Sequence, residues 1–131
     1  MTKEEKALIV YRMERAHEAI EEAKMLFDAG HINAYVNRLY YACFYAVSAL
    51  LLTKDFSTSK HGYLRSLMHR EFVKTGLIPK ELGKHFDMLF DNRLEGDYAD
   101  FARFKADEVS GWLERTQEFV RHIEGLISKL E

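Results

Sequence analysis

A histidine between two cations stands in the segment SKHGYLR, which begins at Ser59. Lys60, His61 and Arg65 fall within two turns of an expected helix start, where unpaired backbone N–H groups and the helix dipole favour an anion. His61 can exchange protons near neutral pH, because an imidazole titrates in that range. A histidine at a helix start is also commonly an exposed cap or a packing residue, so both interpretations stay open.

An arginine interrupts a second apolar pattern, in the segment RLEGDY. Arg93 follows Leu89 by four residues and Phe86 by seven, so its guanidinium continues the inward stripe of a helix. Asp97 comes four residues after Arg93, and Tyr98 is next. A cation, a carboxylate and a phenol would then gather at one helix end, where either a reactive site or a simple salt bridge explains them.

A third polar group lies early in a long apolar segment. Arg38, Tyr41 and Tyr45 share one helical face at spacings of three and four, and Asn37 precedes them. A cation in a segment that otherwise belongs to the core needs an acceptor or a route to solvent, because an unpaired buried charge is very unfavourable. Arg38 is therefore predicted either to pair with an acidic residue or, with Asn37 and the tyrosine hydroxyls, to line a groove.

Composition and spacing exclude several other kinds of chemistry. With 19 Lys and Arg against 21 Asp and Glu, the net charge is −2, so no chain-wide basic field attracts nucleic acid. The sequence has no glycine-rich phosphate loop, and its single cysteine, Cys43, rules out a CxxC zinc site. The histidines show no HExxH arrangement, and the one ExxH spacing, Glu14 with His17, falls outside the apolar stripe. We expect no metal and no cofactor.

Helices must position these side chains, because apolar residues recur at spacings of three and four along most of the chain. The stripes predict five helices: from Ile9 to a stop at Gly30, from a cap at Asn33 to about Thr53, from Ser59 to Gly76, from Pro79 to a break near Gly96, and from Val109 to Ile127. The second helix is apolar almost all round and is predicted to be central. The expected fold class is an all-α antiparallel helical bundle, in a single domain over residues 1–131.

The sequence pattern does not indicate a membrane or exported protein. The longest uncharged stretch, from Leu39 to Thr53, is shorter than the ~20 residues that a membrane-spanning helix needs. The charged start of the chain lacks the apolar core and cleavage site of a signal peptide. A lone cysteine in an apolar run fits a reducing compartment, so we expect a cytoplasmic protein with no membrane contact.

Three segments in this order and spacing resemble a HEPN domain: NRLYYACFYAVSALL, SKHGYLRSLMHREFVKTGLI and LFDNRLEGDYADF, followed by a long C-terminal helix. The resemblance covers residues 5–128 and is greatest to the small stand-alone HEPN proteins of bacteria and archaea. It implies an all-α bundle of several helices, often a homodimer, that works on RNA or nucleotides. Many such proteins are metal-independent endoribonucleases, and many are toxins encoded beside a minimal nucleotidyltransferase that neutralises them.

The resemblance also implies roles for particular residues. Ribonucleases of the family carry an arginine and, after four to six further residues, a histidine, and two copies of the motif meet across the dimer. Arg93 matches the arginine, which stabilises charge on the scissile phosphate. Tyr98 stands after four spacers in place of the histidine, so His61 is the candidate for proton transfer, provided that its helix begins near Arg93. Tyr98 could also correspond to the tyrosine that the partner enzyme modifies in some neutralised toxins.

Three hypotheses for the function stay open. The first is a HEPN ribonuclease or toxin whose dimer cleft holds two sets of residues, catalytic Arg93, His61, Tyr98 and Asp97 and ligand-binding Asn37, Arg38, Tyr41 and Lys60. The second, motivated by the replaced histidine, is a non-catalytic module that binds a nucleotide or a nucleotidyltransferase partner. The third is a helical dimer with a purely scaffolding role. The family resemblance favours the first two.

Overall fold

The computed structural model describes residues 1–93 and 103–131 of the chain. Its elements are, in chain order, α1 (Lys3–Asp28), α2 (Ile32–Leu52), α3 (His61–Met68), the π-helical turn η1 (His69–Val73), α4 (Lys80–Asn92), α5 (Ala106–Val109) and α6 (Trp112–Leu130). The described residues form helices and connecting loops, without a strand. The predicted all-α helical bundle is confirmed.

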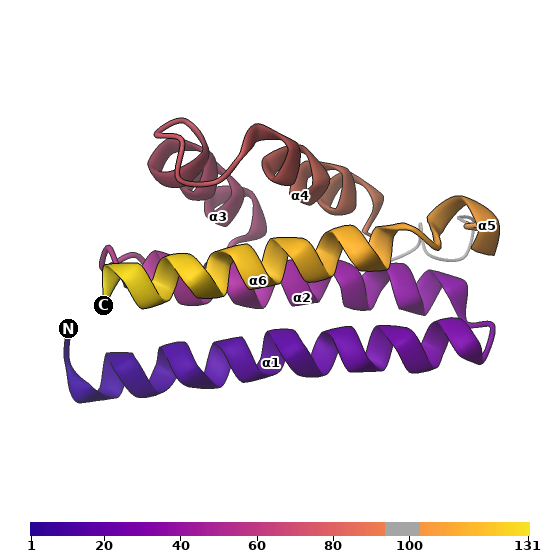
Figure 1. The fold of residues 1–131 in the computed structure, drawn as a ribbon, viewed down its shortest axis with the longest axis horizontal. Coiled ribbons are helices and arrows are strands. Elements are labelled where there is room, and N and C mark those ends of the chain that lie inside the picture. The colour runs from indigo at the N-terminus through magenta and orange to yellow at the C-terminus, as the bar shows by residue number, and fades with distance from the viewer. Residues whose placement is uncertain (94–102) are drawn as a thin grey trace.

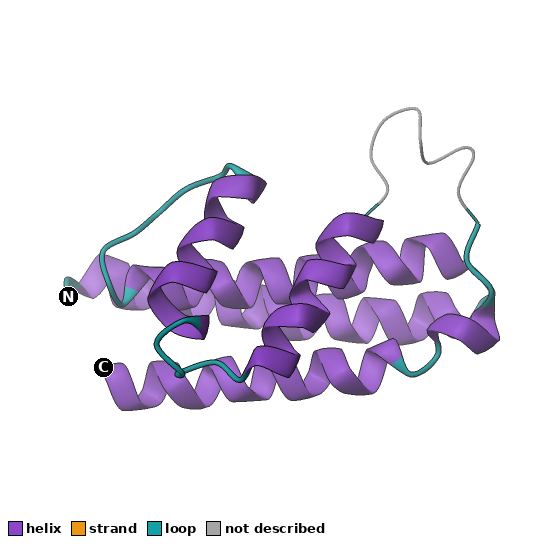
Figure 2. Ribbon diagram, turned by 90° about the horizontal axis from the view of Figure 1, so that it is seen from above, coloured by secondary structure: helices purple, strands orange, loops and turns teal. Residues whose placement is uncertain are grey.

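The helices form two layers. Figure 1 shows α1, α2 and α6 lying along the long axis of the molecule, with α3 and α4 stacked on the side of α2 and α6 that faces away from α1. α1 and α2 are antiparallel, and α6 runs in the same direction as α2, because the segment from α3 to α5 carries the chain back (Figure 1). Seen from above, α3 and α4 cross the long helices obliquely (Figure 2). The shorter pair therefore covers one face of the three-helix layer.

α2 is the central helix, as its apolar composition predicts. Thirteen of its 21 residues are buried, and it packs against α1, α3, α4 and α6. The buried residues of α1 include the predicted stripe of Ile9, Met13, Ala16, Ile20 and Ala23. Within the described ranges, no helix combines the length and the apolar composition needed to cross a bilayer.

Two glycines end helices where the sequence predicts stops. Gly30 follows α1 with a φ of +82°, and Gly76 follows η1 with a φ of +85°, a left-handed conformation that other residues rarely adopt. After α1, the N–H of Gly30 donates to the carbonyl of Phe27 (3.0 Å) and the N–H of His31 to that of Leu26 (2.8 Å). This pair of bonds is a Schellman motif, and it turns the chain directly into α2.

The start of α2 and the course of the last predicted helix differ from the sequence prediction. The N-cap of α2 is His31 rather than Asn33. The side-chain oxygen of Asn33 instead accepts a hydrogen bond from the backbone N–H of Phe104 (3.2 Å), which ties the start of α2 to the segment before α5. The last predicted helix is interrupted, since α5 ends at Val109 and α6 begins at Trp112.

A tyrosine of α2 stabilises the break between α5 and α6. Ser110 and Gly111 occupy the break, and glycine has a low helix propensity. The Tyr35 hydroxyl lies 2.8 Å from the carbonyl of Val109 and 3.2 Å from that of Ser110. It therefore satisfies backbone groups that the break removes from helical bonding. The two residues of this contact are 74 positions apart, so the apolar periodicity of a single helix cannot predict it.

Candidate functional site

Three helices meet at the ring of Tyr40. This residue lies on α2 and is completely buried. Its hydroxyl oxygen is 2.6 Å from Nδ1 of His61, the first residue of α3. The guanidinium carbon of Arg93, directly after α4, lies 5.6 Å from the centre of the same ring. The structure therefore brings His61 and Arg93, which are distant in the sequence, onto one buried side chain.

The imidazole of His61 packs among aromatic rings. It stacks on Phe44 with ring centres 4.4 Å apart, and it meets the ring of Tyr41 edge-on at 5.9 Å. The Tyr40 ring lies nearly parallel to it, with centres 5.7 Å apart. These ring contacts define the plane of the imidazole. His61 is only half-buried, so part of the residue still meets solvent.

Two guanidinium groups stack on Phe90. The guanidinium carbon of Arg65 lies 3.9 Å from the ring centre of Phe90, and that of Arg93 lies 4.0 Å from it. Arg93 also donates a hydrogen bond to the carbonyl of Phe90 (3.2 Å), and Arg65 pairs with Asp91 (3.3 Å). Guanidinium groups are common ligands of phosphate in proteins, and Asp91 offsets part of the charge of Arg65 here. We call these residues the Tyr40 cluster: Tyr40, His61, Arg65, Phe90 and Arg93.

Contacts between η1 and α4 hold the two sides of the Tyr40 cluster together. Nε2 of His69 and Oδ1 of Asp87 are 2.9 Å apart. Gly83 packs so closely on η1 that a Cβ atom added there would lie 3.1 Å from a methyl carbon of Val73. The missing side chain of Gly83 permits this approach, which holds α4, the helix directly before Arg93, against the segment that continues from His61.

Arg38 and Tyr41 form another cation–aromatic contact beside the Tyr40 cluster. The guanidinium carbon of Arg38 lies 5.3 Å from the ring centre of Tyr41, and its Nε is 3.3 Å from a carboxylate oxygen of Glu22 on α1. An acidic partner for Arg38, one of the two sequence interpretations, is therefore what the structure contains. Tyr45 lies one turn after Tyr41 on α2, and its hydroxyl accepts a hydrogen bond from Arg15 of α1 (3.2 Å). Both contacts join α2 to α1.

Two other predicted ligand-binding residues lie at the edge of the Tyr40 cluster. Lys60 is the N-cap of α3, directly before His61, and its side chain is exposed. Asn37 is half-buried on α2, one turn before Tyr41. Their part in binding stays a prediction.

Two predicted catalytic residues, Asp97 and Tyr98, lie outside the described residues. The sequence pattern pairs Asp97 with Arg93 only if their helix continues past Gly96. However, α4 ends at Asn92, and Arg93 has an extended backbone (φ −63°, ψ 140°). The helix on which that i, i+4 pair depends therefore ends before it.

Sequence spacing alone does not identify every member of the Tyr40 cluster. Tyr40 fits the buried stripe of α2, so nothing in the pattern separates it from an ordinary core residue. The sequence places Arg65 within two turns of the helix start at His61, and the i, i+4 spacing of these two residues puts them on one face of that helix. Phe90 joins the cluster only because α3 and α4 lie close together.

A second contact between an imidazole and a hydroxyl lies inside the core. Nε2 of His85, on α4, is 2.8 Å from the hydroxyl of Thr116 on α6. Burial, together with the nearby charge of Arg115, lowers the pKa of His85 to about 4. Burial also raises the pKa of the Cys43 thiol. At neutral pH His85 is uncharged and Cys43 is a thiol, so we assign both to packing.

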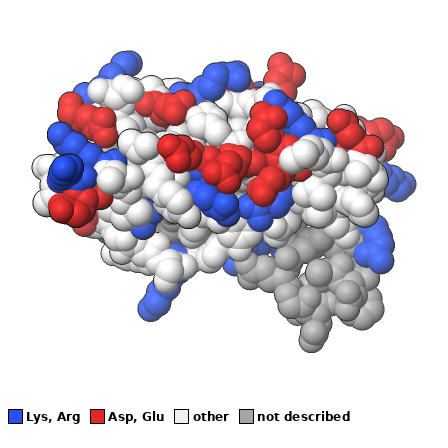
Figure 3. Space-filling view, turned by 90° about the horizontal axis from the view of Figure 1, so that it is seen from below, with Lys and Arg blue, Asp and Glu red and all other residues white. Residues whose placement is uncertain are grey.

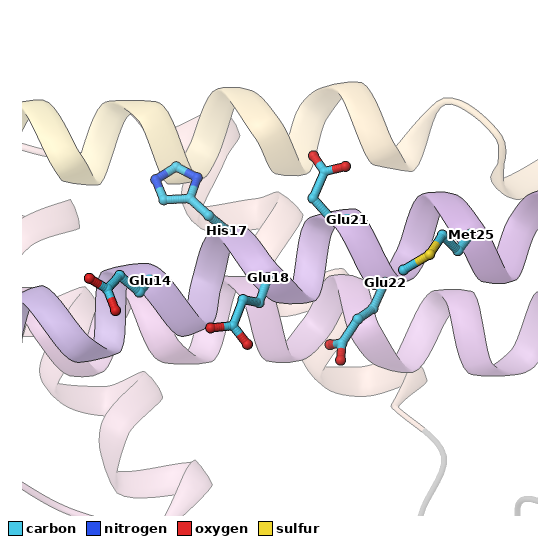
Figure 4. A pocket seen from close by; sticks show the side chains of 6 residues that line it. All are labelled: Glu14, His17, Glu18, Glu21, Glu22 and Met25. Atoms are coloured by element: carbon cyan, nitrogen blue, oxygen red, sulfur yellow. The ribbon is translucent and has the colours of Figure 1, made fainter.

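An acidic hollow lies on the outer face of α1. Figure 3 shows Asp and Glu side chains gathered along this face, with Lys and Arg beside them. The hollow has a volume of about 560 Å³ and is lined by Glu14, His17, Glu18, Glu21, Glu22 and Met25. His17 and Glu21 point toward α6, whereas Glu18 and Glu22 point away from it (Figure 4). In the part of the chain that the structure describes, no three His, Cys, Asp or Glu side chains come together as a metal site requires.

Comparisons with known proteins find relatives along nearly the whole chain. The family model described as HEPN domain matches residues 9–126. A Thermotoga maritima protein named UPF0332 protein is 42% identical over 128 residues, which are 98% of this chain and 97% of that protein. A Methanocaldococcus jannaschii protein named "Putative toxin" is 30% identical over 118 residues, which are 89% of this chain and 80% of that protein. A crystal structure of a Thermus thermophilus protein shares the fold, with a TM-score of 0.73 at 15% identity, over 89% of this chain and 96% of that chain.

Proposed function

This chain belongs to the HEPN domain family, and from that premise we propose that it is a metal-independent endoribonuclease and the toxin-like component of a two-component system. One observation carries the proposal: His61 and Arg93 both contact Tyr40, so an acid–base group and a fixed cation lie at one place. Arg93 matches the arginine of the family motif. His61 takes the role of the histidine that this sequence lacks after Arg93.

The proposed reaction is a transesterification within the RNA strand. The 2′-hydroxyl oxygen attacks the adjacent phosphorus, and the bond from phosphorus to the 5′-oxygen of the next nucleotide breaks. The 2′-oxygen loses a proton and the 5′-oxygen gains one, so a 2′,3′-cyclic phosphate and a 5′-hydroxyl form. His61 transfers one of these protons, and water exchanges the other. Arg93 and Arg65 stabilise the negative charge that develops on the phosphate oxygens.

The proposed partners are RNA as substrate, a second copy of this chain, and a minimal nucleotidyltransferase that neutralises the toxin in the cytoplasm. The name of the Methanocaldococcus jannaschii relative, "Putative toxin", supports a system with a neutralising partner. A homodimer would present two Tyr40 clusters to one RNA. Doubling the local positive charge in this way would aid binding, because the net charge of the chain is only −2 and gives no general attraction.

The test is cleavage of a labelled single-stranded RNA by the purified protein in the presence of EDTA. Arg93→Ala is expected to lower the cleavage rate by roughly 10²-fold or more, because a fixed charge at the phosphate is lost. Arg121→Ala is the matched control, since Arg121 is an exposed arginine of α6, and it should cleave at the wild-type rate. Undiminished cleavage by Arg93→Ala would overturn the proposal.

A second candidate function is supported by the residue at position 98. Tyr98 stands where the ribonucleases of the family have their histidine, which favours a non-catalytic module that binds a nucleotide or the nucleotidyltransferase. This candidate predicts that no RNA is cleaved and that the partner co-purifies. It also predicts a higher Tm with added nucleotide, because a ligand of the folded state stabilises that state. If no partner co-purifies and no nucleotide raises the Tm, this candidate fails.

A further inference from the structure

The hydroxyl of Tyr40 lies at the Nδ1 edge of the His61 imidazole. The rings of Phe44 and Tyr41 hold the plane of the imidazole by stacking and edge contacts. These contacts do not distinguish the Nδ1 edge from the opposite carbon edge, because a half-turn about the Cβ–Cγ bond leaves the ring in the same plane. The hydroxyl of Tyr40 does distinguish them, because the nitrogen forms a hydrogen bond and the carbon does not.

We propose that Tyr40 is the positioning residue of His61: its hydroxyl holds Nδ1, so that Nε2 is the nitrogen that exchanges a proton with the substrate. The catalytic part of this inference rests on the proposed ribonuclease function. Tyr40 is completely buried, so its hydroxyl is itself held in place. A hydroxyl both donates and accepts, and it can therefore bond Nδ1 whether or not that nitrogen carries a proton. His61 stays oriented in its neutral and its charged form.

Tyr40 contacts both His61 and the guanidinium of Arg93. The guanidinium of Arg93 lies over the rings of Tyr40 (5.6 Å) and Phe90 (4.0 Å). One tyrosine therefore sets the separation between the proton-transfer group and the charge that faces the phosphate. Because a displacement of about 1 Å in a reacting group can lower a rate by roughly 10²-fold, losing the hydroxyl should affect the chemical step more than binding.

The kinetic test compares the wild type, Tyr40→Phe, His61→Ala and the double variant in RNA cleavage. Tyr40→Phe keeps the ring that Arg93 contacts and removes only the hydroxyl. It is expected to lower kcat by roughly tenfold or more, with KM within about twofold of the wild-type value. In the His61→Ala background it should have no further effect, because Tyr40 acts through His61. An unchanged kcat in Tyr40→Phe, or an equal loss in both backgrounds, would overturn the inference.

Tyr35 provides a matched control on the same helix. It is 1% exposed, and its hydroxyl donates to the carbonyl of Val109 at 2.8 Å. Tyr35→Phe therefore removes a buried hydrogen bond of similar length, and it should lower Tm while leaving kcat unchanged. If Tyr35→Phe lowers kcat as much as Tyr40→Phe does, the effect is general to the helix and the positioning role is wrong.

A measurement without RNA separates this inference from the proposed function. Two-dimensional ¹H–¹⁵N NMR observes the ring nitrogens of His61 in the wild type and in both phenylalanine variants. The Nδ1 resonance is expected to move in Tyr40→Phe and to stay in place in Tyr35→Phe. If it moves although the wild type cleaves no RNA, the contact stands and the ribonuclease proposal fails. If it is unchanged in Tyr40→Phe, the positioning inference fails whatever the RNA assay shows.

Discussion

Two histidines of this protein each meet a hydroxyl group, in two different surroundings. His61 lies 2.6 Å from the Tyr40 hydroxyl, is half-buried and stands at the start of α3. His85 lies 2.8 Å from the Thr116 hydroxyl, is 8% exposed and sits between α4 and α6. A contact between an imidazole and a hydroxyl is therefore not by itself a reactive site. What surrounds the ring decides its role.

Solvent access and nearby charge account for the difference. A charged imidazolium is unfavourable in the low-dielectric core, and this burial lowers the pKa of His85 to about 4. His85 therefore stays neutral and serves packing. His61 keeps contact with solvent, and it shares Tyr40 with the guanidinium of Arg93. The surroundings of His85 are those of a packing residue, whereas those of His61 are the ones on which the proposed ribonuclease function rests.

The largest expected effect is an opposite response of the two histidines to substitution, in which one variant loses RNA cleavage and the other loses stability. His61→Gln should lower RNA cleavage by roughly 10²-fold or more, because an amide does not transfer protons at neutral pH, and it should change Tm little. His85→Gln should lower Tm and leave the cleavage rate per folded molecule unchanged. Cleavage assays and thermal unfolding of both proteins measure this. The distinction between the two histidines is lost if His85→Gln inactivates the protein as strongly as His61→Gln.

The next largest effect is a loss of folding stability in acid that is caused by protonation of His85. Its pKa is about 4 in the folded protein against an ordinary value of 6.5, so the unfolded chain binds more protons between these two values. The contribution of His85 to the free energy of unfolding is fully present above pH 6.5. It falls by about 3 kcal/mol as the pH is lowered toward 4.

The measurement compares denaturant unfolding of the wild type with that of His85→Leu, which has no group to titrate at this position. The stability of the wild type relative to the variant should fall as the pH is lowered from 6.5 to 4. A difference that is constant over this range would contradict the prediction.

A smaller effect tests which cations belong to the reactive surroundings of His61. Arg65→Ala should lower cleavage by about tenfold, less than Arg93→Ala does, because Asp91 at 3.3 Å already offsets part of the Arg65 charge. Arg115 is the matched control beside His85, where it pairs with Glu118 at 3.2 Å, and Arg115→Ala should leave cleavage unchanged. Equal losses in the two variants would show that the two surroundings do not differ in function.

The smallest effect is slow labelling of Cys43 in the enclosed region. Burial raises the pKa of this thiol, and the thiolate is the form that reacts. A thiol reagent at pH 8 should therefore label Cys43 in the folded protein far more slowly than in denaturant. Reaction at the unfolded rate would show that this part of the core is open.

Much of the fold follows from local features of the sequence. The stripe through Ile9, Met13 and Ala16 predicts α1, because a helix buries every third or fourth residue. Gly30 and Gly76 predict helix ends, because glycine adopts the left-handed backbone of a helix C-terminus more readily than other residues do. These features act within a few residues, so they can be recognised without knowing what the helix packs against.

The parts of the fold that local patterns miss depend on contacts from distant segments. Asn33 has the type of residue that caps a helix, yet its side chain bonds to the backbone of Phe104. The last helix breaks where the Tyr35 hydroxyl meets the carbonyls of Val109 and Ser110. In both cases a partner far along the chain overrides the local preference.

The candidate site divides in the same way. The sequence by itself determined which side chains were out of place in an apolar pattern, namely Arg38, His61 and Arg93, because such interruptions are visible from residue type and spacing. Only the tertiary structure decided that Arg38 pairs with Glu22 on α1, whereas His61 and Arg93 meet at Tyr40. Tyr40 carries no mark of these contacts in the sequence, because its periodicity reports burial. The direction of its hydroxyl depends on how α3 and α4 cross α2.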